Sequence, residues 1–126
     1  MYPNDRRYSE EHEWISVDGD SATVGITNYA QDQLGDIVFV ELPEVDKAIQ
    51  KGDVIGTIES VKAVSEIYAP VSGTVTDVNT LLDDKPETVN GDPHGVGWYC
   101  KVRLSDAGEL DGLMDAAAYQ EFAASQ

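Results

Sequence analysis

Residues 56–73 read GTIESVKAVSEIYAPVSG and hold two short apolar runs on either side of a lysine. Short runs of β-branched residues bounded by glycine and proline are typical of β-strands. The pattern predicts a strand over 54–59 and a return strand over 65–69. The strands are joined by a tight hairpin, and Lys62 lies at or beside the middle of that hairpin.

Short strands and turns continue outward from this hairpin in both directions. Further strands are expected over residues 13–17, 22–26, 37–42, 74–78 and 98–104. Helical segments are expected over 29–34, with Thr27 or Asn28 as cap and Gly35 at the end, over about 80–84, and from 105 to 122, with a turn cluster at 90–93. Many short strands at close spacing indicate a mainly β sandwich or barrel, and 126 residues suit a single domain.

The chain is strongly acidic, with 24 Asp and Glu against 8 Lys and Arg and a net charge of −16. This balance argues against nucleic-acid binding, because phosphate contacts need Lys and Arg. It fits a solvated acidic surface, a salt-rich habitat, or basic or metal-bearing partners. The sequence contains no long apolar run, and its first residues lack the features of a signal or transit peptide, so we expect a cytoplasmic protein that binds no membrane.

Motifs of enzyme catalysis are missing from the sequence, which has no G-x-S-x-G elbow, P-loop or G-x-G-x-x-G. His12 and His94 lie far apart, and neither belongs to a metal-ligand motif. We expect a structural or partner-facing role for His12 and a solvated position for His94. Cys100 lies in a predicted strand, where a buried, inert thiol is the simplest expectation. We therefore predict neither a catalytic residue nor a metal site.

Lys62 allows two interpretations. On spacing alone, an ordinary surface lysine of a turn is the simpler one. Lysine is, however, the usual attachment point of tethered group carriers. Glu59 and Glu66 frame the amine three residues before and four residues after it, which suits recognition by a modifying enzyme. Glu59 is our candidate recognition element, with a merely solvated role as the alternative.

Residues 56–63 and 68–73 strongly resemble the lipoylation segment of glycine cleavage H proteins. The likeness spans about residues 8–122 and includes further ordered motifs at 12–14, 24–31, 34–43, 89–93 and 97–98. It implies a lipoyl-domain-like β sandwich, or barrel-sandwich hybrid, with an N-terminal hairpin and short C-terminal helices. Residues 1–126 are then expected to form one lipoyl-carrier domain.

The resemblance also implies site residues. By position, Lys62 corresponds to the lipoyl attachment site. A cleft for the loaded arm would be lined by Glu13, Glu66, Ile26 and Leu34, with Glu11 and Gln33 as weaker candidates. Glu66, Glu11 and His94 replace an Asp, a Ser and a Tyr that are commoner in the family. For Glu13 two roles remain open. Its carboxylate could bind the ammonium group of a unit carried on the arm, or Glu13 could be a solvated strand residue.

The function implied is that of a non-catalytic carrier subunit in glycine catabolism and one-carbon metabolism. Its covalently bound lipoic acid would take an aminomethyl unit from glycine decarboxylase (P protein) to aminomethyltransferase (T protein). Dihydrolipoamide dehydrogenase (L protein) would reoxidise the arm, and a lipoyl ligase or transferase would attach it. A monomer is expected.

Four alternatives to this function can be distinguished. Lipoyl domains of 2-oxo acid dehydrogenases place Asp before the lysine, where this chain has Val61, and biotin carriers place Met on both sides. An H-like protein that relays lipoate to other acceptors would fail to stimulate glycine decarboxylase. A hydrolase would turn over without a partner.

Overall fold

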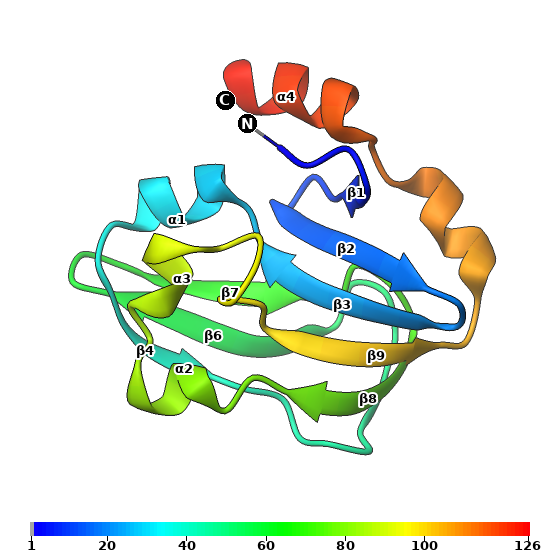
Figure 1. Cartoon of the computed structure of the whole chain (residues 1–126), viewed down its shortest axis with the longest axis horizontal. Helices are drawn as coiled ribbons and strands as arrows, with labels where there is room; N and C mark the ends of the chain where they lie inside the picture. The colour runs from blue at the N-terminus through cyan, green and yellow to red at the C-terminus, as the bar shows by residue number, and fades with distance from the viewer. Residues whose placement is uncertain (1) are drawn as a thin grey trace.

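The computed structural model describes residues 2–126 and contains two antiparallel sheets with short helices around them (Figure 1). The larger sheet has the order β1 (Arg7–Tyr8), β2 (Glu13–Asp18), β3 (Ser21–Ile26), β9 (Cys100–Leu104), β8 (Gly73–Val78) and β5 (Ala48–Ile49). The smaller sheet has the order β4 (Ile37–Glu41), β6 (Val54–Ser60) and β7 (Val64–Tyr68). The helices are α1 (Asn28–Leu34), α2 (Leu81–Asp84), α3 (Thr88–Gly91), the 3₁₀ helix η1 (Ala107–Gly112) and α4 (Ala116–Ala124). The predicted mainly β fold class is confirmed.

One apolar core joins the two sheets. Val24 and Val102 of the larger sheet and Ile58 and Ile67 of the smaller sheet are buried in the same cluster. Because side chains alternate between the two faces of a strand, each sheet can turn one apolar face inward. Burying that face removes apolar surface from water and supplies the main driving force for folding.

Helix α1 ends at Leu34 as predicted but begins at Asn28, one residue before the predicted start. Thr27 is its N-cap, and the Thr27 hydroxyl accepts a hydrogen bond from the Ala30 N–H at 3.2 Å. Gly35 follows the helix with φ +82°, a conformation that a side chain disfavours. The helix therefore ends next to β4, and the connection lies beside the lysine hairpin.

Two predictions around the late turns need correction. The strand expected from residue 98 begins at Cys100, because the Trp98 N–H bonds to the Gly95 carbonyl within a turn. The cluster expected at 90–93 as a turn is partly helical, because α3 extends through Gly91. Burial of Val89 in the core anchors this helical turn.

The predicted C-terminal helical segment is interrupted. Met114 leaves the helical conformation and pairs with Tyr8 in an isolated β-bridge. Asp115 then starts α4, and its carboxylate accepts from the Ala118 N–H at 2.8 Å. Strands β1 and β5 have two residues each and were not predicted. None of the helices within residues 2–126 has the length and apolar character that crossing a bilayer requires.

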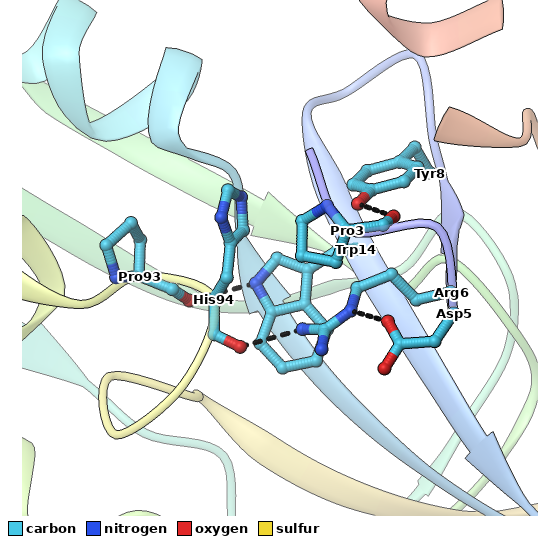
Figure 2. Close-up of polar contacts among 7 residues, drawn as sticks. All are labelled: Pro3, Asp5, Arg6, Tyr8, Trp14, Pro93 and His94. Atoms are coloured by element: carbon cyan, nitrogen blue, oxygen red, sulfur yellow. Dashed lines mark hydrogen bonds and ion pairs between the residues drawn. The ribbon is translucent and has the colours of Figure 1, made fainter. Parts of the chain in front are cut away.

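Arg6 links the N-terminal segment to His94, in the turn that follows α3 (Figure 2). Its guanidinium donates to the His94 carbonyl at 2.7 Å and lies 4.5 Å from the centre of the Trp14 ring. The Trp14 indole N–H donates to the Pro93 carbonyl at 2.9 Å. These contacts hold the turn after α3 against β2.

Candidate functional site: a lysine at a hairpin tip

Lys62 is the middle residue of the three, 61–63, that connect β6 and β7, and it lies at the hairpin tip as predicted. The Ser60 N–H donates to the Ala63 carbonyl at 2.8 Å. The Ser60 hydroxyl in turn accepts from the Lys62 N–H at 3.3 Å and the Ala63 N–H at 3.1 Å. A side-chain oxygen thus satisfies the backbone donors of the turn, which orders a tip that carries an exposed lysine.

The Lys62 side chain is exposed, and its stem lies beside the end of α1. A Cβ placed on Gly35 would approach Lys62 Cε to 3.1 Å. The Val61 N–H donates to the Asp36 carbonyl at 3.0 Å, so the tip rests on the α1–β4 connection. Across residues 2–126 the single ion pair joins Arg6 to Asp5 and leaves the Lys62 amine uninvolved. This amine suits a covalent tether because it is accessible on an ordered support.

Asn90 of α3 makes three hydrogen bonds that hold the α1–β4 connection in place. Its Oδ1 accepts from the Ile37 N–H at 2.9 Å, and its Nδ2 donates to the Gly35 carbonyl and to Gln31 Oε1, both at 2.9 Å. The sequence predicts only a turn cluster around Asn90, not this role. No local signal indicates it, because the partners lie 53 to 59 residues away.

Glu13 is buried, with 2% of its surface exposed, so a solvated strand position is wrong. Its carboxylate accepts from the Ser9 hydroxyl at 2.8 Å and from the Tyr68 N–H at 3.0 Å. Burial raises the pKa of the Glu13 carboxyl to about 7, although both hydrogen bonds act in the opposite direction. Glu13 can therefore exchange a proton near neutral pH.

Tyr68, which sequence reasoning did not single out, contacts two of the predicted cleft carboxylates. Its N–H bonds to Glu13, and its hydroxyl donates to Glu66 Oε1 at 3.2 Å. Glu66 itself is exposed on β7, while Ile26 is the cross-strand partner of Glu13 and is buried. The β2, β3 and β7 positions are thus close together.

A pocket of about 570 Å³ opens beside Glu13 and is also lined by Glu11, Tyr68, Lys51 and Met114. The remaining cleft candidates lie outside this pocket. Leu34 of α1 packs against the core, and Gln33 is exposed on the same helix. Of the predicted cleft residues, only Glu11 and Glu13 therefore line this pocket.

The histidines and the cysteine have structural positions. His12 Nδ1 lies 2.7 Å from the Tyr119 hydroxyl, and burial lowers the pKa of His12. His94 is half-buried and not solvated as expected, because its Nε2 accepts from the Asn28 N–H at 3.1 Å. Cys100 is buried as predicted, and burial raises the pKa of its thiol to about 12. A thiol held protonated is a poor nucleophile.

A mainly β fold that presents an accessible lysine on an ordered hairpin tip has the features of a carrier domain, in which lysine holds a tethered group. Comparison with known proteins identifies the kind of carrier. The chain belongs to the glycine cleavage H-protein family, whose model matches residues 6–126.

Its relatives are similar over nearly the whole chain. The glycine cleavage system H protein of Thermotoga maritima is 53% identical and matches 96% of this chain and 98% of its own length. That of Parvibaculum lavamentivorans is 58% identical over 97% of this chain and 98% of its own. The crystal structure of the H protein from Mycobacterium marinum superposes with a TM-score of 0.88 at 42% identity, over 95% of this chain and 97% of that one.

Proposed function

We propose that Lys62 carries lipoic acid in amide linkage and that the chain is the mobile carrier of a glycine cleavage system. The observation that carries this proposal is the exposed Lys62 on the serine-capped hairpin of an H-protein family member. When bound, the lipoyl group supplies a disulfide that can accept a one-carbon unit and two electrons. The carrier itself is not a catalyst, and we place its work in the bacterial cytoplasm.

The partners follow from this role. The lipoyl arm visits glycine decarboxylase, aminomethyltransferase and dihydrolipoamide dehydrogenase in turn, after a lipoyl ligase or transferase has attached it. Tethering raises the local concentration of the bound unit at each partner's active site. The ordered turn of residues 60–63 keeps the root of the tether fixed while the arm moves.

Glu13 and Glu66 are proposed to hold the ammonium group of the cargo. Strand β7 rises by about 13 Å from Val64 to Tyr68, at the usual rise per residue. An arm of roughly 14 Å rooted at Lys62 has the reach to follow this strand toward Glu13. A carboxylate that loses its proton near neutral pH would bind an ammonium group more tightly as the anion.

The test of the attachment site is peptide mapping after incubation with a lipoate–protein ligase, ATP and lipoate. One lipoyl group is expected, on Lys62, and Lys62→Ala should abolish it while Lys51→Ala leaves it in place. A lipoyl group on Lys47 or Lys51 would contradict the assignment. Stimulation of glycine decarboxylase by the loaded protein separates this carrier from a protein that only relays lipoate.

Glu59 is proposed as a recognition element for the attaching enzyme. It is half-buried in β6, between Phe39 and Val64 on the neighbouring strands. Glu59→Gln keeps the shape and removes the charge, so lipoylation should slow by about tenfold with little change in melting temperature. The wild-type rate in this variant would leave Glu59 with no role in recognition.

A further inference from the structure

Apolar side chains gather on the surface around Lys62. Among the described residues, four of the five most exposed large apolar side chains lie on the hairpin or on the neighbouring strand β4. Val61 is 70% exposed, Val64 64%, Val38 54% and Phe39 51%. Scattered apolar residues are ordinary on a protein surface, but a cluster of this kind marks an interaction site.

The strand register brings this cluster together. Phe39 of β4 lies opposite Glu59 of β6, and Glu59 lies opposite Val64 of β7, so the three side chains form one row across the sheet. A register shift between Ile37 and Phe39 interrupts the alternation of β4. As a result Ile37 and Val40 are buried, whereas Val38 and Phe39 both face solvent.

The charged residues around the cluster are mostly acidic. Within residues 36–41 and 54–68 the only basic residue is Lys62, while the acidic residues are Asp36, Glu41, Glu59 and Glu66. A complementary surface would have an apolar centre and a basic rim.

We propose that Val38, Phe39, Val61 and Val64 form the docking surface for the enzyme that acylates Lys62, and that this enzyme presents an apolar surface rimmed by basic groups. The proposal rests on the carrier function above. In the step concerned, the neutral Lys62 amine attacks the carbonyl of a lipoyl group activated as an acyl adenylate. A C–N bond forms, the C–O bond to AMP breaks, and the nitrogen loses one proton.

The position of the cluster favours this partner over those that act on the cargo. An enzyme that attacks the lysine nitrogen must approach the root of the side chain, and Val61 and Val64 lie within two residues of it. Enzymes that act at the far end of the arm work roughly 14 Å from its root, so their contact with the carrier can lie elsewhere.

The test compares two full-length variants of matched chemistry. Val38→Thr/Val61→Thr/Val64→Thr removes apolar surface and keeps β-branched side chains. The control, Val45→Thr/Val54→Thr, makes the same change at two exposed valines outside the cluster (48% and 45%). Lipoylation is followed by mass with a lipoate–protein ligase, ATP and lipoate, over a range of carrier concentrations.

For the triple variant we expect KM for the carrier to rise about tenfold, with kcat and melting temperature unchanged and the control at the wild-type KM. Equal KM values for triple variant and control would overturn the docking surface, while a lipoyl group on Lys62 in both would leave the carrier function intact. Two further outcomes would overturn it. One is normal lipoylation with impaired loading by glycine decarboxylase, and the other is a wild-type dimer that the triple variant abolishes.

Discussion

At the scale of single residues, Glu13 illustrates how burial changes the chemistry of a common side chain. The chain has 24 carboxylic residues, and only Glu13 among those of the described segment is buried. Its pKa is raised because the charged form is poorly solvated, and the Ser9 and Tyr68 donors offset this effect only in part. The ionised form of Glu13, the proposed contact for the cargo's ammonium group, therefore lowers the free energy of unfolding.

The sign of that cost is testable. The pKa of Glu13 is about 7 in the folded state against an ordinary value of 4.5, so the folded state binds more protons between these values. The Glu13 contribution to the free energy of unfolding should thus fall as pH rises from 4.5 to 7, by roughly 1–3 kcal/mol. Below pH 4.5 both states are protonated, and the penalty is absent.

Glu13→Gln keeps an acceptor for the Tyr68 N–H and cannot ionise. Denaturant unfolding of both proteins at several pH values should therefore show the variant gaining stability relative to wild type as pH rises through this window. A constant difference between the two proteins across pH 4–8 would mean that folding does not raise the pKa of Glu13.

At the scale of elements, the end of α1 and the lysine hairpin form one unit. Gly35 combines a positive φ with close approach of the Lys62 stem. The same connection accepts the Val61 N–H through Asp36. The conformation of the α1–β4 connection thus determines where the tether begins.

Gly35→Ala should lower the free energy of unfolding by about 1–3 kcal/mol and also slow lipoylation of Lys62, because its Cβ would displace the lysine stem. Gly52→Ala is the matched control, since Gly52 has φ +93° but no neighbour within 4 Å of an added Cβ. Chemical denaturation and the lipoylation rate separate the two effects. If the two variants are lipoylated at the same rate, contact with Gly35 does not position Lys62.

At the scale of the whole molecule, residues distant in sequence hold the lysine support in place. Arg6 and Trp14 fix the turn after α3 (Figure 2). Asn90 of α3 bonds to the α1–β4 connection itself. Asn79 makes a comparable long-range clamp, in which its Nδ2 donates to the Val96 and Trp98 carbonyls at 2.8 Å.

Asn90→Ala should cost about 2–3 kcal/mol of stability, because it leaves the Ile37 N–H and the Gly35 carbonyl without their partner. Asn79→Ala should destabilise to a similar extent. Hydrogen exchange of the Val61 amide, which bonds to Asp36, should become faster in Asn90→Ala only. Equal exchange in both variants would show that the clamp does not reach the hairpin.

The sequence by itself determined the mainly β class, the hairpin with Lys62 at its tip, a helix cap at Thr27 or Asn28, and the family. These features depend on neighbours within a few residues, since turn chemistry, alternation and caps are local. The motifs that resemble the H-protein family could be recognised for the same reason, because each is a short segment with its own spacing.

Only the tertiary structure decided the burial of Glu13, the clamp of Asn90, the outward turn of Val38 and Phe39, and the positions of α3, β1 and β5. Burial and hydrogen-bond satisfaction depend on what a distant segment brings to the site: Tyr68 lies 55 residues from Glu13, and Ile37 lies 53 residues from Asn90. A register shift likewise exists only relative to a partner strand. The chemistry of the proposed site therefore arises from contacts that no local pattern encodes.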